Sequence, residues 1–301
     1  MTATFTTIKT RVTNLVGSNV AISTTEIEQL IQAEHETVLN DQSWADRKAQ
    51  GVLSTVAPYS TGTVSASAGS TTIAGVGTTF TSAMTGRWIR MGTGLQYYKI
   101  TYVSATSLTS EVAIPVAVAA GTTFSIFQHI YSLPSDCERI TSMTYDGVVR
   151  ESTHQDIDRQ DPYRSATGSV PMVYAYMELD NSGYRAVELW PVPSAAFVVR
   201  FQYLKTNSLT TGSDKPLYRS DVLVWKSGAS AAFLLFAKTG DQSWVQLATT
   251  YLTLYKDSLA GAIMDDLGKN SPAKKIRDVM YSGLYGVRSD FFLDHDAGVG
   301  Y

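Results

Sequence analysis

Apolar residues recur at helical spacing near the N-terminus of the chain. A first stripe with three- and four-residue spacing runs from Ile8 to Leu15 and is interrupted at Gly17, and a second stripe runs from Ile27 to Val38. Ser23 and Glu26 precede the second stripe with the spacing of a capping box, in which each residue can satisfy a backbone amide of the other. The pattern predicts two helices joined by a short turn.

A second helical pattern occupies the C-terminal part. Val222 to Phe236 keeps helical spacing, with small residues between the larger ones, and Gly240 interrupts it. A longer stripe follows from Ser243 to Leu267, with Gly268 just beyond it, where a left-handed cap is common. The spacing predicts two long helices that meet near Gly240.

Between the helical ends the hydrophobic period changes to two. Short alternating segments rich in Thr, Val and Tyr follow one another from about Gly51, each bounded by Gly, Ser or Thr. They are Thr63–Ser67, Thr71–Ala74, Trp88–Met91, Tyr97–Val103 and Thr106–Val112, with Thr122–Ile130 as a closing strand. Such spacing predicts a small antiparallel barrel or sandwich, and the flanking helices favour an insertion.

More strands are expected after residue 131. They are Glu138–Tyr145, Met172–Leu179, Ala186–Pro191 and Phe197–Tyr203, and Asp146-Gly147 is a hairpin signal. The predicted class is α+β: a helical bundle from the N- and C-terminal helices, an inserted antiparallel β barrel or sandwich, and a further β region. The expected domains are residues 1–50 with 215–275, 51–130, 131–214, and an extended C-terminal arm over 276–301.

Composition narrows the function classes. Of 301 residues, 44% are apolar and 17% charged, which argues against disorder. The 24 basic and 27 acidic residues give a formal charge of −3, without the basic excess of a nucleic-acid-binding surface. The single cysteine, Cys137, rules out a disulfide within the chain and favours intracellular assembly. No signal peptide is visible, and the apolar run Gly228–Ala237 is about half the length that spans a bilayer, so no membrane partner is expected.

Candidate chemistry is sparse. The best polar cluster, His154 to Asp161, lacks the ligand pattern of a calcium loop and is expected to be a solvated loop. Gly75-Val76-Gly77 is not followed by a phosphate-binding lysine, and Cys137 has no obvious base near it. The sequence therefore predicts no enzyme and no catalytic, cofactor-binding or metal site.

Aromatic residues stand out, with 17 Tyr, 5 Trp and 10 Phe. One group lies in the non-periodic tail, where it can fold back on the same chain or contact another subunit. A second group lies on predicted strands. The candidate interaction residues are Tyr281, Tyr285, Phe291, Phe292 and Tyr301 in the tail, and Trp88, Tyr97 and Tyr98 on the strands.

Several motifs resemble those of phage proteins. The segment Gly62–Ile114 is similar to a small β module found in many tailed-phage structural proteins. Over about Thr7 to Gly268 the chain resembles phage head–tail adaptor (connector) proteins, although its G-x-x-P motif is looser than the usual G-x-P. The motifs, in chain order, are Tyr131–Asp136 (Y-S-L-P-S-D), Asp161-Pro162, Gly168–Pro171 and Trp190–Pro193 (W-P-V-P).

The resemblance implies a structural virion protein of the neck, assembled in the host cytoplasm. It implies a homo-oligomeric, dodecameric ring that docks on the portal protein and receives tail or nozzle proteins. Genomic DNA would pass through the channel without sequence-specific contacts. The C-terminal arm would clasp the portal or a neighbouring copy.

Two other hypotheses stay open. One is a tail, baseplate or host-recognition subunit whose β module binds glycan through Trp88, Tyr97 and Tyr98. The other is a hydrolase whose candidate residues are His154, Asp156 and Asp158.

Overall fold

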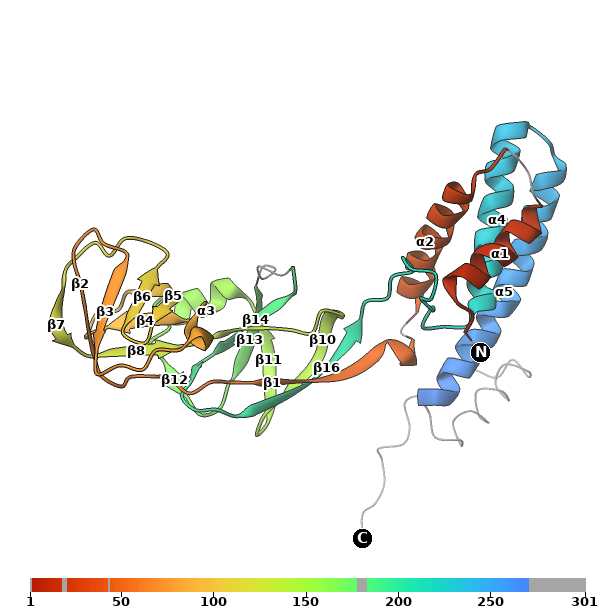
Figure 1. Cartoon of the computed structure of the whole chain (residues 1–301). Helices are drawn as coiled ribbons and strands as arrows, with labels where there is room; N and C mark the ends of the chain where they lie inside the picture. The colour runs from red at the N-terminus through yellow and green to blue at the C-terminus, as the bar shows by residue number, and fades with distance from the viewer. Residues whose placement is uncertain (1, 18–20, 43, 178–182, 271–301) are drawn as a thin grey trace, which may run out of the picture. The chain divides into compact units, whose positions relative to one another are not determined.

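The chain folds into an α+β structure, which confirms the class expected from the sequence (Figure 1). The structure is a computed structural model that describes residues 2–17, 21–42, 44–177 and 183–270. It divides into two compact units. One is formed by the two ends of the chain, up to residue 48 and from residue 207; the other comprises residues 49–206.

The first unit is helical. Its elements are α1 (Phe5–Val16), α2 (Thr24–Asp41), the short 3-10 helix η1 (Ala45–Arg47), α4 (Ser220–Thr239) and α5 (Ser243–Asn270). Helix α4 packs against α1, α2 and α5. The two helix pairs predicted from the hydrophobic spacing are confirmed. The last helix is longer than expected, because it continues through Gly268 to Asn270.

Local signals set the helix ends. The Ser23 hydroxyl accepts a hydrogen bond from the Glu26 amide (3.2 Å), and the Glu26 carboxylate accepts one from the Ser23 amide (2.8 Å), which completes the capping box of α2. Gly240 adopts the left-handed conformation after α4, with φ of 71°, and its amide donates to Phe236 O. A residue with a side chain would be strained there.

The core of the helical unit joins residues from both ends of the sequence. Ile8 and Ile31 are fully buried with Val222 and Leu235. His35 lies inside this core, where Nε2 donates to Asn207 O (3.0 Å) and Nδ1 accepts from the Tyr218 hydroxyl (2.8 Å). Burial lowers the pKa of His35, so the ring is neutral at neutral pH, and this tautomer satisfies both nitrogens.

Replacing Tyr218 by Phe tests this buried pair. The substitution keeps the aromatic ring but leaves Nδ1 of His35 buried without a donor, which we expect to lower the free energy of unfolding by about 1–3 kcal/mol. Chemical denaturation measures the change. Tyr255→Phe is the matched control: the Tyr255 hydroxyl makes no hydrogen bond within the described residues, so this variant should stay within about 0.5 kcal/mol of wild type. Equal losses in both variants would contradict the assignment.

The second unit holds two seven-stranded sheets. Sheet A has the order β1-β16-β10-β11-β13-β14-β9. Strands β11 and β13 run parallel, whereas the pairs β16–β10, β10–β11, β13–β14 and β14–β9 are antiparallel. Its strands are β1 (Lys48–Ser54), β9 (Ile130–Ser132), β10 (Cys137–Thr144), β11 (Val148–Ser152), β13 (Val173–Met177), β14 (Ala186–Trp190) and β16 (Val198–Lys205).

Sheet B is antiparallel and has the order β7-β2-β3-β6-β5-β4-β8. A bridge from Tyr59 to Ile126 adds to β8, and the sheet surrounds its own apolar core. Its strands are β2 (Thr63–Ala66), β3 (Thr72–Val76), β4 (Trp88–Met91), β5 (Tyr97–Ser104), β6 (Ser107–Ser110), β7 (Val118–Thr122) and β8 (Phe124–Phe127), with the 3-10 helix η2 (Ser82–Met84) before β4.

Three smaller elements complete the unit. They are helix α3 (His154–Gln160) and the paired short strands β12 (Thr167–Gly168) and β15 (Val192–Pro193). The Asp146-Gly147 hairpin is confirmed: both residues have positive φ, 47° and 130°, and they connect β10 to β11. The solvated loop expected over His154 to Asp161 is wrong, because this segment forms α3, capped by Thr153, and Asp161 at its end is buried.

Candidate functional site

A group of ionisable residues lies between sheets A and B. We call it the junction cluster; its members are Arg90, His129, His154, Asp158, Asp161, Arg164 and Glu188. Four of them are buried: His129, Asp161, Arg164 and Glu188. They come from β4, the β8–β9 connection, α3, the loop that follows α3, and β14. Elements of both sheets thus meet at one set of polar contacts.

Arg164 is the centre of the cluster. Its side chain is 2% exposed and pairs with Glu188, which is fully buried on β14. The guanidinium also donates to Asp161 O (2.7 Å) and to the Asp158 carboxylate (2.6 Å). Burial alone would lower the pKa of Arg164, but the hydrogen bonds to Glu188 and Asp158 outweigh it, so the pKa is raised and the charge is kept.

The backbone at Arg164 is unusual. Its φ is 51°, in the left-handed region that residues with side chains rarely occupy. The neighbouring carboxylate holds this loop: Asp161 accepts from the amides of Ser165 (2.7 Å) and Ala166 (2.8 Å) and from the Trp190 indole (3.2 Å). Burial alone would raise the pKa of Asp161, but the hydrogen bonds that the carboxylate accepts outweigh it. The pKa is therefore lowered, and Asp161 stays ionised.

Sheet B reaches this loop through Arg90. Nη2 of Arg90 donates to the carbonyls of Tyr163 (2.5 Å) and Arg164 (2.9 Å), and the guanidinium lies 5.0 Å from the centre of the Phe127 ring. The Arg164 loop therefore binds Glu188 of sheet A with its side chain and Arg90 of sheet B with its backbone. This arrangement fixes the two sheets to one another.

Two histidines complete the cluster in different ways. His154 is half-exposed on α3, with Nδ1 2.7 Å from the Glu188 carboxylate. His129 is buried, and its Nδ1 has no hydrogen-bond partner in the described chain. Burial, followed by the nearby positive charge of Arg164, lowers the pKa of His129 to about 3. His129 is therefore neutral and acts as a packing residue.

The candidate aromatic residues on the strands lie at two places. Trp88 and Tyr97 pack around His129, at ring distances of 4.3 and 6.0 Å, on the side of sheet B that faces the junction cluster. Tyr98 packs against the core of sheet B instead. Tyr281, Tyr285, Phe291, Phe292 and Tyr301 lie outside the described residues.

The candidate hydrolase residues His154, Asp156 and Asp158 lie on one helix, but they serve structural contacts. His154 and Asp158 contact Glu188 and Arg164, and Asp156 caps α3 through Thr153. Within the described ranges, no group of three or more His, Cys, Asp or Glu side chains is placed to hold a metal ion. Burial raises the pKa of the Cys137 thiol to about 11, which disfavours a reactive thiolate.

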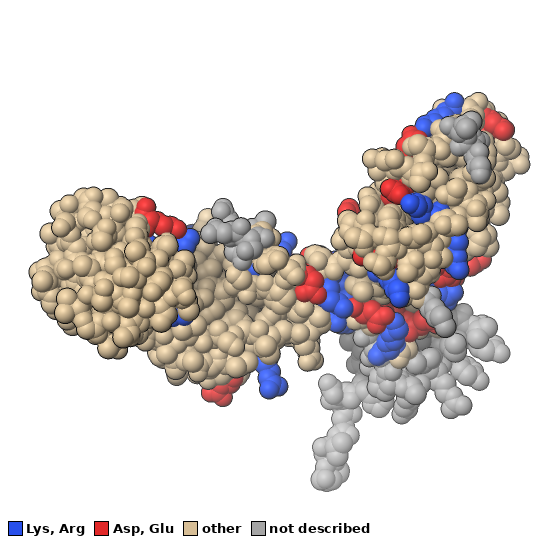
Figure 2. Space-filling view, in the orientation of Figure 1, with Lys and Arg blue, Asp and Glu red and all other residues tan. Residues whose placement is uncertain are grey.

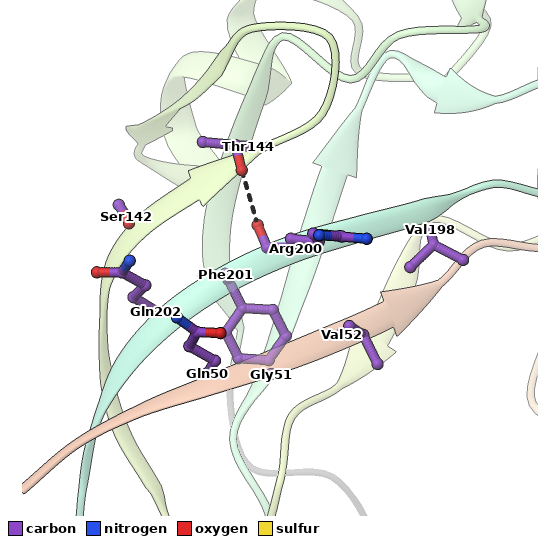
Figure 3. Close-up of a pocket in the computed structure, with 9 residues that line it drawn as sticks. All are labelled: Gln50, Gly51, Val52, Ser142, Thr144, Val198, Arg200, Phe201 and Gln202. Atoms are coloured by element: carbon purple, nitrogen blue, oxygen red, sulfur yellow. Dashed lines mark hydrogen bonds between the residues drawn. The ribbon is translucent and has the colours of Figure 1, made fainter.

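One open concavity, of about 440 Å³, lies over β1, β10 and β16 (Figure 3). Arg200 is its only ionisable residue, and the Thr144 hydroxyl donates to the Arg200 carbonyl (3.5 Å). The Phe201 ring lies against Gly51, where any side chain would collide with it. The full lining is Gln50, Gly51, Val52, Ser142, Thr144, Val198, Arg200, Phe201 and Gln202. The lining offers no carboxylate, imidazole or amine that could act as a general acid or base, so nothing in it would activate the hydroxyls of Ser142 and Thr144.

Arg164 and Glu188 were not among the residues singled out in the sequence. The available signal was a lone Glu within the apolar strand Ala186–Trp190: a charge in a strand buried on both faces needs a partner of opposite sign.

No helix in the described chain carries an apolar stretch sufficient to cross a bilayer.

These observations define an α+β protein in which a buried ion pair joins the two sheets of the second unit. The comparison with family models gives the family itself: the model described as SU10 adaptor protein matches residues 3–276. The chain therefore belongs to this family of phage adaptor proteins, as the resemblance of its motifs implied. A search of curated proteins found no match to it.

Replacing Arg164 by Met tests the central ion pair. The variant leaves the Glu188 carboxylate buried without its main partner, and we expect a loss of about 3–5 kcal/mol in the free energy of unfolding. The double variant Arg164→Met, Glu188→Leu removes both charges and should recover much of the loss. Chemical denaturation at neutral pH measures both. A double variant as unstable as the single one would show that the pair is not the cause.

The neutral buried histidines predict a dependence of stability on pH. His129 and His35 have pKa values lowered from 6.5, so below pH 6.5 the unfolded chain binds protons that the folded chain does not. The free energy of unfolding therefore falls as the pH decreases below 6.5, by at most about 1.4 kcal/mol per pH unit for each histidine. Denaturation between pH 6.5 and about 5 measures the slope. His129→Phe should reduce it; an unchanged slope would contradict the assignment.

Proposed function

We propose that this chain forms a homo-oligomeric ring at the head–tail junction of a phage particle. In this proposal the ring docks on the portal protein, receives tail or nozzle proteins, and surrounds the channel through which the genome passes. The match of the adaptor family over residues 3–276 carries the proposal, since it covers the helical elements and both sheets.

The charge distribution supports a role in protein contacts. Between Thr55 and Gln128 the only charged residues are Arg87, Arg90, Lys99 and Glu111. Arg90 is bound in the junction, and Lys99 pairs with Glu111 at 2.9 Å. Accordingly, Figure 2 shows almost no charged atoms over sheet B. Protein interfaces are depleted of charge in the same way, whereas a surface that binds DNA phosphates is basic.

The C-terminal arm is proposed to hold the portal or a neighbouring copy through its aromatic residues. A chain ending at Asn270 should keep the unfolding temperature of the full chain and lose affinity for the portal. A full-length chain in which Tyr281, Tyr285, Phe291, Phe292 and Tyr301 are all replaced by Ala should lose affinity to a similar extent, because aromatic anchors contribute most of the energy of such contacts.

Purified portal rings of the same phage are the probe for this test. Co-sedimentation should show that the full chain binds the rings, and negative-stain electron microscopy should show the added density as a ring of copies. Failure of the full-length chain to bind would overturn the proposed docking. Unimpaired binding by the truncated chain would overturn only the role of the arm.

A further inference from the structure

Strand β1 forms one edge of sheet A. Among the described strands it pairs with β16 alone, so its other side has no strand against it. Every second residue of an edge strand directs its amide and carbonyl away from the sheet, where they can pair with a strand of another chain. Natural proteins often protect such edges with proline or charged residues, and β1 has neither between Ala49 and Ser54. This edge is therefore open to an additional strand.

The outer face of the sheet beside this edge is apolar and basic. Val52 is 66% exposed and Val198 is 50% exposed, and both line the concavity over β1 and β16 (Figure 3). Arg200 lies in the same lining, which contains no carboxylate. Lys48 lies on the same side of β1 as Val52, because side chains alternate along a strand. We call these four residues the β1 site.

The two cations of the β1 site have no acidic partner. Arg200 and Lys48 are exposed, and neither forms an ion pair with a described residue. Two exposed valines between unpaired basic residues suit a partner with large apolar side chains and flanking carboxylates. A strand of this composition could pair with the open edge and cover the valines at the same time.

One segment of the chain itself has this composition. Residues 290–296 read D-F-F-L-D-H-D, with three aspartates, three large apolar residues, and no lysine or arginine. In an extended strand, Asp290, Phe292 and Asp294 would share one side, with the ring between the two carboxylates. The segment lies outside the described residues. It is complementary to the β1 site in both charge and apolar character.

We propose that residues 290–296 of one copy add as a strand to the β1 edge of a neighbouring copy. Phe292 covers Val52 and Val198, and the carboxylates on either side of its ring lie beside the two cations of the β1 site. Nineteen residues, 271–289, separate the segment from the end of α5, and a chain of this length spans up to roughly 65 Å when extended. The segment can therefore cross from one copy to another.

This mode of contact suits a ring. The segment and the β1 site are different surfaces, so each copy can donate one strand and receive another, and the contact is heterologous. Backbone pairing gives affinity, and the alternate side chains give the register. The inference rests on the proposed function and names what the aromatic arm contacts on a neighbouring copy.

Photo-cross-linking of the full-length chain tests where the segment lies. A benzoylphenylalanine at position 292 keeps an aromatic side chain there and reacts with whatever lies beside it. In an equal mixture of isotope-labelled and unlabelled copies, mass spectrometry should find cross-links from position 292 to residues 48–54 or 198–202, joining a labelled chain to an unlabelled one. The same photo-residue at Phe233, an exposed aromatic position on α4, is the control and should not reach these residues.

Two results of this experiment would overturn the inference. Cross-links to the β1 site within a single chain would show that the segment folds back on its own copy. Cross-links only to other elements, or none at high protein concentration, would show that the segment does not bind the β1 edge.

Charge reversal tests the complementarity without assuming the direction of the added strand. Lys48→Glu combined with Arg200→Glu, or Asp290→Arg combined with Asp294→Arg, should each weaken self-association on the order of ten-fold in sedimentation velocity. A chain with all four substitutions should recover the association. Lys215→Glu, which changes an exposed lysine on the loop before α4, is the control and should have no effect.

Failure of the fourfold variant to recover association would contradict the pairing of these charges. All variants should keep the unfolding temperature of the full chain, because the two basic residues are exposed. Portal binding, measured separately, decides the proposed function whatever the outcome here.

Discussion

The helical unit depends on one constraint: the apolar surfaces of the first two helices can be buried only against a helix from the far end of the chain. His35 meets Tyr218 across 183 residues of sequence, and Tyr251 donates to Leu15 O across 236. Helices α1 and α2 alone would expose a broad apolar stripe, and a pair of short helices is marginal in water. The unit can form only when both ends come together, so the segment between them must begin and end at the same place.

The β-rich unit is subject to a different constraint. Its two sheets have separate apolar cores, so only specific contacts between the sheets can fix their relative position. Arg164 provides these contacts by binding Glu188 with its side chain and Arg90 with its backbone. A buried ion pair contributes little net stability, but breaking it is costly, so it favours one arrangement over alternatives. A protein that transmits contacts between larger assemblies benefits from such rigidity.

Local signals in the sequence predicted much of this fold. The Ser23–Glu26 capping box, the Asp146-Gly147 hairpin and the stripe of α4 each depend on neighbouring residues, and each is confirmed. The junction cluster could not be predicted in this way. The strand that carries Glu188 and the loop that carries Arg164 are separated in sequence, and their pairing depends on how the sheets meet. The short helix α3 was missed because its polar residues resemble a loop and only Ile157 is buried.

Burial of apolar surface also bears on assembly. A single chain buries its apolar residues only as far as its own elements allow, and between Thr55 and Gln128 the chain carries only four Lys, Arg, Asp or Glu residues. In a head-to-tail ring each added copy gains one contact, whereas the copy that closes the ring gains two and loses its translational freedom only once. Individually weak contacts are therefore sufficient. A surface with few charged residues suits this role. Its exposure costs little in the free chain, and the weak contacts that it makes add up when many copies repeat them.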